Sequence, residues 1–230
     1  MKLNMRKLVP SSIKRAAKAR LASYRIWRAT RAIVKLRRGE VPTRRMLRLL
    51  SAGWGNDGFA PTLDYLEEVA RSAATTEGPI LECGSGLTTL LLGLLAGRRG
   101  VAIHSLEHSA NWQQRIAKVL SENAIRNVEV MNAPLRDYGA FAWYDVRLEQ
   151  LPEQFRLIVC DGPPGNTKGG RYGLLPLVGE RLPQGGVIVL DDADRPGELE
   201  MVRRWKKEMD LAMQVFEKPA GNFARLVRCS

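Results

Sequence analysis

The sequence predicts an α/β protein with a doubly wound, mostly parallel sheet, and three observations lead to this fold class. Short apolar strands alternate with helical segments from residue 61 onward, an order typical of parallel sheets covered by helices on both faces. Polar or turn-forming residues directly follow five of the strands. The 45% content of hydrophobic residues is sufficient for a real core in a chain of 230 residues.

The first 50 residues differ in composition from the rest, and we expect residues 1–50 to form a basic helical extension. They hold 16 of the 36 Lys and Arg residues and a single acid, Glu40. Apolar and aromatic residues recur every three to four positions over 11–38, which predicts a basic amphipathic helix, and a short helix over 43–50 is expected next. The turn-rich stretch 51–60 then predicts a boundary, so that residues 51–230 form the α/β domain.

The expected elements of the α/β domain follow from its alternating pattern. A helix over 61–74 places several apolar side chains on one face. The expected strands cover 80–83, 101–106, 128–131, 155–160 and 187–190. The expected helices between and after them cover 88–96, 109–123, 172–182 and 198–208. Two final strands, 212–216 and 223–227, are joined by the hairpin-like turn KPAGN and are expected to add an antiparallel pair.

The stretch ILECGSGLTT, residues 80–89, reads as a strand, a glycine turn and a helix start. In a doubly wound sheet the ligand binds beyond the carboxyl ends of the strands, and Gly84 and Gly86 allow the backbone to approach it closely. Thr89 stands where a dinucleotide-binding turn has its third glycine. Glu82 would repel a pyrophosphate. The turn therefore favours a cationic ligand, and S-adenosylmethionine carries both a sulfonium and an ammonium group.

Glu107 ends the second expected strand, about 20 positions after Gly86, as an acid that binds ribose does. Its carboxylate can accept hydrogen bonds from both ribose hydroxyls of an adenosine. This feature fits NAD and S-adenosylmethionine equally well.

Taken together, five motifs resemble those of the class I S-adenosylmethionine-dependent methyltransferases. They are ECGSGLTT, SLEH with Trp112 shortly after it, VCDGPPG, RYG and GGVIVLDDADR. The resemblance covers roughly residues 55–228. It is strongest to the branch with an E-x-G-S-G-x-[ST]-T first motif and D-G-P-P after the fourth strand. It implies a Rossmann-like fold, methyl transfer and S-adenosylmethionine as the cofactor.

The resemblance also implies roles for individual residues. Asp161, after the fourth strand, would face the methyl group and the substrate as the catalytic candidate. The implied cofactor contacts are, on the methionine side, Glu82, Gly84, Ser85 and Gly86, at the ribose Glu107, and beside the adenine His108, Ala133 and Pro134. Asn132 stands where related proteins often carry an acid for the adenine amine.

Three carboxylates are expected to converge at the carboxyl ends of the strands. Asp161, Asp191 and Asp192 end neighbouring strands, so they would bind a divalent metal such as Mg²⁺ or raise the pKa of one member. Metal-dependent O-methyltransferases place acids similarly, but Ala193 stands where their asparagine is typical. The glycine-rich segment 165–173 predicts a lid with substrate contacts, and a solvated loop is the alternative. The predicted contacts are Lys168, Arg171 and Tyr172.

The predicted function is methyl transfer from S-adenosylmethionine to an oxygen or nitrogen of a small-molecule, sugar or lipid-linked acceptor. An NAD-linked oxidoreductase, an RNA methyltransferase that uses the basic arm, and a non-catalytic binding protein remain alternatives.

The basic helix over 11–38 favours peripheral contact with an anionic membrane over contact with nucleic acid. Packing on its own domain or a second subunit, and a transit peptide, are the other interpretations. Three cysteines without a pairing pattern favour a reducing compartment. We therefore expect a cytoplasmic protein that contacts the inner membrane face, and the sequence makes no prediction of the oligomeric state.

Overall fold

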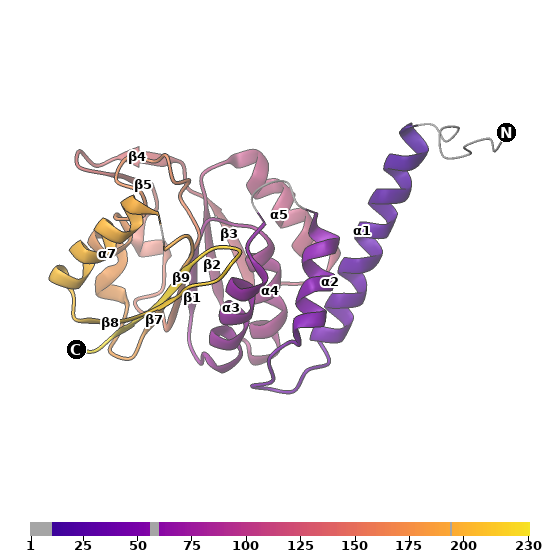
Figure 1. Ribbon diagram of the computed structural model, residues 1–230, viewed down its shortest axis with the longest axis horizontal. Coiled ribbons are helices and arrows are strands. Elements are labelled where there is room, and N and C mark those ends of the chain that lie inside the picture. Colours follow the sequence, from indigo (N-terminus) through magenta and orange to yellow (C-terminus); the bar gives the residue numbers. More distant parts are fainter. Residues whose placement is uncertain (1–10, 56–59, 194) are drawn as a thin grey trace.

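The structure is a computed structural model that describes residues 11–55, 60–193 and 195–230 (Figure 1). The strands of its central sheet alternate with helices that cover both faces, as expected for a doubly wound α/β fold. The predicted fold class is confirmed.

Five strands of the central sheet are parallel, and the last two are antiparallel. The parallel strands are β1 (Ile80–Cys83), β2 (Ile103–Glu107), β3 (Val128–Asn132), β6 (Leu157–Cys160) and β7 (Val187–Leu190). β9 (Phe223–Arg228) runs antiparallel to both β7 and β8 (Leu211–Phe216). The order across the sheet is β3-β2-β1-β6-β7-β9-β8. The chain reverses its direction of growth between β1 and β6, where an open α/β sheet binds its ligand.

The helices of the α/β domain begin at the places that the sequence signals. The bounds are α3 (Leu63–Thr75), α4 (Leu87–Ala96), α5 (Ala110–Glu122), α6 (Leu174–Val178) and α7 (Pro196–Glu208). The Thr62 hydroxyl accepts from the amide of Tyr65 at the start of α3, and the Ser109 hydroxyl accepts from the amide of Trp112 at the start of α5. Because these side chains satisfy free amides of the first turn, both helix starts are fixed locally.

Two hydrophobic cores lie on opposite faces of the sheet. One contains side chains of α6, α7 and the strands, with Trp143, Phe155 and Trp205 among its large members. The other contains side chains of α3 and α4, and it also includes Ala29 and Leu47 from the N-terminal segment. The segment from Ala29 to Leu50 therefore shares a core with the α/β domain.

The N-terminal segment forms α1 (Ser11–Ile33) and α2 (Arg44–Trp54), which cross closely (Figure 1). A Cβ placed on Gly53 would lie 2.7 Å from the amide nitrogen of Ile26 and 3.0 Å from the carbonyl oxygen of Ala22, so glycine permits the crossing. α1 ends five residues before the predicted end of the basic helix, and α2 continues into the stretch 51–60 that the sequence predicts to be a linker. None of the helices in the described ranges has the length and apolar character needed to cross a bilayer.

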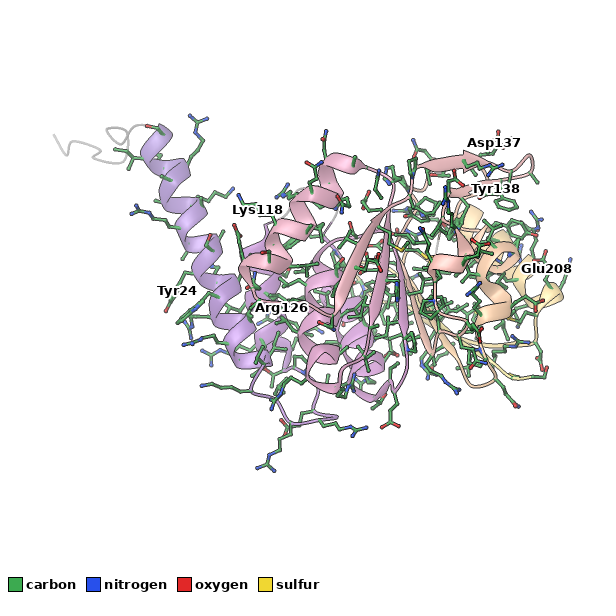
Figure 2. The ribbon with its side chains drawn as sticks, turned by 180° about the vertical axis from the view of Figure 1, so that it is seen from behind. Tyr24, Lys118, Arg126, Asp137, Tyr138 and Glu208 are labelled. Atoms are coloured by element: carbon green, nitrogen blue, oxygen red, sulfur yellow. The ribbon has the colours of Figure 1, made fainter. Side chains whose placement is uncertain are left out.

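A short hairpin, β4 (Leu135–Asp137) and β5 (Ala142–Tyr144), was not expected from the sequence. It forms a separate two-stranded sheet above the carboxyl ends of the parallel strands (Figure 1). No strand was expected between residues 131 and 155, because three-residue strands are too short to show a period of two. Figure 2 shows Asp137 and Tyr138 at the outer end of this hairpin.

Candidate functional site

The side chain of Glu82 in β1 is linked to the following glycine turn by hydrogen bonds. One oxygen of this buried carboxylate accepts hydrogen bonds from the hydroxyls of Thr89 and Ser105, both at 2.6 Å. The Thr89 hydroxyl in turn accepts from the amide of Gly86 at 2.8 Å. Burial raises the pKa of Glu82 to about 7, against the effect of its hydrogen bonds. The threonine that replaces the third glycine of a dinucleotide turn thus ties the turn to the strand.

The other carboxylate oxygen of Glu82 is buried and has no hydrogen-bond partner. A buried acceptor without a donor costs free energy, so such groups mark places where a missing donor belongs. This oxygen is the feature of Glu82 that fits the cationic ligand predicted from the sequence.

Gly84 and Gly86 differ in their surroundings. Gly84 has a φ of +89°, and a Cβ there would lie 2.8 Å from the amide nitrogen of Gly162, in the loop after β6. Gly86 has a φ of 178°, which any residue adopts, and a Cβ there would meet no atom within 4 Å. The first glycine is therefore required by the fold, whereas the second borders open space in which a ligand can lie.

Glu107 lies beside this turn at the end of β2 and is almost completely buried. Its Oε2 accepts from the Ser85 hydroxyl at 2.7 Å and from the Ser85 amide at 3.2 Å. Its Oε1 accepts from the Ser109 amide at 2.8 Å and lies 3.1 Å from Nδ1 of His108. These contacts fix both carboxylate oxygens next to the glycine turn. The Ser85 hydroxyl is a donor that a ribose hydroxyl could replace.

The residues predicted to border an adenine lie on the same edge. Ala133 is buried and its amide donates to the Glu107 carbonyl at 2.7 Å, while Pro134 and Asn132 are exposed. The side chain of His108 is 37% exposed. The structure therefore brings the loops after β1, β2 and β3 together, as the topology requires.

The acidic residues after β6 and β7 surround a buried arginine that the sequence interpretation placed in a lid. Arg171 is 1% exposed. One of its Nη atoms lies 3.0 Å from the Asp192 carboxylate and 3.4 Å from that of Asp161, and the guanidinium also donates to the carbonyls of Asp161 and Asp191. Arg195 lies 2.9 Å from the same oxygen of Asp192. The guanidinium therefore joins the carboxyl ends of the two strands.

The carboxyl groups of this cluster have altered proton affinities. Burial, followed by the charges of Asp161 and Asp192, raises the pKa of Asp191 to about 8. Burial also raises the pKa of Asp161, although Arg171 and a hydrogen bond with Asp191 oppose this rise. The raised pKa values of this hydrogen-bonded pair favour one proton held between Asp191 and Asp161.

The predicted divalent metal fits this donor set poorly. Oxygens of Asp161, Asp191 and Asp192 lie within 4.8 Å of one another, a spacing that could hold an ion. However, the guanidinium of Arg171 is already within hydrogen-bonding distance of two of the three carboxylates. A fixed cation thus already neutralises the site, and no step of the chemistry below depends on a metal.

The segment that carries the predicted substrate contacts 168, 171 and 172 is folded against its neighbours, unlike a mobile lid. The Tyr172 hydroxyl donates to Glu208 at 2.7 Å, and its ring packs under Arg204, 3.7 Å from the ring centroid. The backbone of Lys168 accepts from the Ala142 amide of β5, and its side chain pairs with Asp137 at 3.1 Å. The segment is thus folded against the hairpin and α7. Arg171 and Tyr172 are buried, and Lys168 is the exposed cation of the three.

The sequence interpretation assigned no contact to two aromatic residues near the site. Nε1 of Trp112 donates to the Ser85 carbonyl at 2.9 Å, which fixes the middle of the glycine turn. The buried Tyr144 packs its hydroxyl against Gly162, where a Cβ would collide with it. Aromatic residues directly after a strand end, or within the segment that follows it, are the signal that could have indicated them.

The sequence of this region was compared with those of known protein families. Residues 81–193 match the family model of a methyltransferase domain. This part of the chain is thus similar to a methyltransferase domain. The match includes the glycine turn, Glu107, Asp161 and the paired acids after β7, so the resemblance inferred from the motifs is confirmed at the level of the superfamily. Among curated proteins, none matches the sequence significantly.

Solved structures show the same methyltransferase fold. An S-adenosylhomocysteine-bound methyltransferase from Podospora anserina has a TM-score of 0.59 and 15% identity, covering 97% of this chain and 99% of its own. A precorrin-6y C5,15-methyltransferase from Geobacter metallireducens has a TM-score of 0.57 and 15% identity, covering 76% of this chain and 92% of its own. At such identities the likeness establishes the fold of this domain.

Proposed function

We propose that the chain binds S-adenosylmethionine at the carboxyl edge of β1 and β2 and transfers its methyl group to an oxygen or nitrogen of a small-molecule, sugar or lipid-linked acceptor. One observation carries the proposal. The buried Glu107 carboxylate and the Ser85 hydroxyl lie directly beside the open space at Gly86. The two oxygens of this carboxylate suit the two hydroxyls of a ribose, one of which would take the place of the Ser85 hydroxyl as donor.

The remaining residues of the turn suit the methionine end of the cofactor. The unpartnered oxygen of Glu82 is an acceptor for an ammonium group. The amides at the start of α4 and the backbone of Ser85, fixed by Trp112, belong to the same turn. When bound, the cofactor supplies an electrophilic methyl on a sulfonium, and S-adenosylhomocysteine is the product that leaves.

Asp161 is the proposed acceptor of the proton that an oxygen or nitrogen nucleophile must lose. Its pKa is raised by burial, which brings it nearer to neutral pH and strengthens it as a base. Arg171 and Asp191 hold the carboxylate through hydrogen bonds, so it cannot rotate freely. The chain thus contributes position and one proton acceptor, and a positioned base typically accelerates such a step by ~10²–10⁴-fold.

Calorimetric titration with S-adenosylhomocysteine tests the cofactor assignment. We expect binding to the wild-type chain, and a loss of about tenfold or more in affinity for Glu107→Ala, because that variant lacks the acceptors for both ribose hydroxyls. Ser230→Ala, at the far end of the chain, is the matched control. Titration with NAD distinguishes a methyltransferase from the alternative of an oxidoreductase. Tight NAD binding without S-adenosylhomocysteine binding would overturn the proposal.

The acceptor is tested separately by product analysis. The chain is incubated with S-adenosylmethionine and pools of phenols, sugars and lipid-linked sugars, and the methylated product is identified by mass spectrometry. We expect Asp161→Asn to reduce turnover strongly while the affinity for S-adenosylhomocysteine stays within a few-fold of wild type. Methylation of RNA in place of all these acceptors would exclude the proposed acceptor class.

A further inference from the structure

The outward face of α1 is the largest group of exposed apolar side chains in the described part of the chain. Across the described residues, seven large hydrophobic side chains are exposed. Five of them lie on α1 or directly after it, with exposed fractions between 41% and 57%. These five are Ile13, Leu21, Tyr24, Trp27 and Val34. A solvated helix does not need such a set, so this face indicates a partner.

The five side chains lie on one side of the helix. At 100° per residue they fall opposite to Ala22, Ala29 and Ile33, which lie at the centre of the partly or fully buried side of α1. Figure 2 shows Tyr24 on the outer side of α1, away from the sheet. The helix is therefore apolar on two opposite faces, and the protein itself covers one of them.

Basic residues accompany the apolar ones on this outward face. α1 contains seven Lys and Arg residues and no acid. The guanidinium of Arg28 lies 5.8 Å from the ring centroid of Tyr24, and that of Arg31 lies 5.1 Å from the ring centroid of Trp27. The rings of Tyr24 and Trp27 are themselves stacked at 5.9 Å. Aromatic rings beside cations are typical of helices at the boundary between lipid and water.

We propose that the outward face of α1, formed by the five apolar residues and the basic residues between them, docks on the surface of an anionic phospholipid membrane. The helix would lie in the plane of the headgroups, with its apolar side chains towards the acyl chains and its cations near the phosphates. Charge complementarity selects this occupant. A second copy of the helix would bring together two faces that carry basic residues and no acid, and nucleic acid would leave the aliphatic side chains in water.

The docking needs no unfolding of the protein. The opposite side of α1 stays packed against α2 at the Gly53 crossing, where Arg25 also donates to the Ala52 carbonyl at 3.3 Å. In Figure 1 the start of α1 rises to the same side of the molecule as the β4–β5 hairpin, which marks the carboxyl edge of the sheet. Because the helix axis would lie in the membrane plane, this edge would open along the bilayer surface, where a lipid-linked acceptor lies. This link to a lipid-linked acceptor rests on the proposed function, whereas the docking itself does not.

Vesicle sedimentation of the full-length chain tests the docking. The vesicles are phosphatidylcholine with or without phosphatidylglycerol, at low and high salt. We expect sedimentation only with the anionic vesicles, weakened by salt. The double variant Tyr24→Ser with Trp27→Ser should bind about tenfold or more weakly, because two large side chains no longer enter the interface. Arg28→Gln with Arg31→Gln should lose roughly fivefold for each charge.

The double variant Leu199→Ser with Val215→Ser is the matched control, because these are the other two exposed large hydrophobics, both 39% exposed. It should bind vesicles like the wild type. Circular dichroism and calorimetry with S-adenosylhomocysteine check that each variant is folded, and these readouts separate a failure of docking from a failure of the proposed function. Equal binding to neutral vesicles, unchanged binding by the aromatic variant, or binding of an RNA oligonucleotide without vesicle binding would each overturn the proposal.

Discussion

The two glycines of the first turn give a prediction in which one methyl group has two different effects. Gly84→Ala places a Cβ 2.8 Å from the amide nitrogen and 3.0 Å from the Cα of Gly162, at a φ of +89°. Gly86→Ala places a Cβ in open space on an extended backbone. We expect the first change to destabilise the fold and the second to affect ligand binding alone.

The magnitude follows from two contributions at Gly84. A left-handed φ costs an L-residue roughly 1–2 kcal/mol, and overpacking against rigid backbone costs about 1–3 kcal/mol more. The free energy of unfolding should therefore fall by about 2–5 kcal/mol, a large part of the stability of a typical domain. Gly86→Ala should change it by less than about 0.5 kcal/mol, as exposed substitutions do.

Urea unfolding followed by circular dichroism measures the first effect, and calorimetry with S-adenosylhomocysteine measures the second. We expect the midpoint to fall by about 1–2 M for Gly84→Ala. Gly86→Ala should keep its midpoint but bind the ligand roughly tenfold or more weakly, because the added methyl occupies the space beside the ribose. If Gly86→Ala binds as tightly as the wild type, the open space at this glycine is not part of the ligand site and the reasoning fails.

Three further predictions concern an arginine, an aspartate and a tryptophan that hold the site. Arg171→Met should lower the free energy of unfolding by about 3–5 kcal/mol in urea, because it leaves buried carboxylates without their cation; a loss under 1 kcal/mol would contradict this role. Because the pKa of Asp191 is raised to about 8, its contribution to stability is full below the unfolded pKa and is lost as pH rises towards 8. Asp191→Asn should flatten this decline in thermal melts from pH 5 to 9, and an unchanged slope would assign the decline to other groups. Trp112→Phe removes the hydrogen bond to the Ser85 carbonyl, and we expect a several-fold loss of S-adenosylhomocysteine affinity with a change in stability under about 1.5 kcal/mol, whereas unchanged affinity would show that the turn holds itself.

The sequence was sufficient for those parts of the fold that depend on local patterns. β1 and β7 were predicted with their observed bounds because each is a short apolar run followed by turn residues. The closing antiparallel pair was predicted from the spacing of its turn. The convergence of Glu107, Asp161 and the acids after β7 followed from topology, since the carboxyl ends of parallel strands meet at one edge.

The parts that were missed depend on contacts between distant segments. Arg171 lies in a glycine-rich stretch that is typical of a mobile loop, and its burial results from carboxylates and carbonyls supplied by two other segments. No local pattern shows that Gly84 touches Gly162, because 78 positions separate them and only the register of β1 with β6 brings them together. In the same way, the end of α2 extends into the expected linker because Trp54 packs on Trp112.

The β4–β5 hairpin belongs to a sheet of its own, apart from the seven strands that carry the glycine turn. Its strands connect to the rest mainly through side-chain packing and the backbone pairing of Ala142 with Lys168. An exchange of residues 135–145 between related chains would therefore leave the register of the central sheet unchanged. Evolution, or a protein engineer, could change the shape of the wall above Asp161 by such a graft, while the cofactor half of the site is inherited intact.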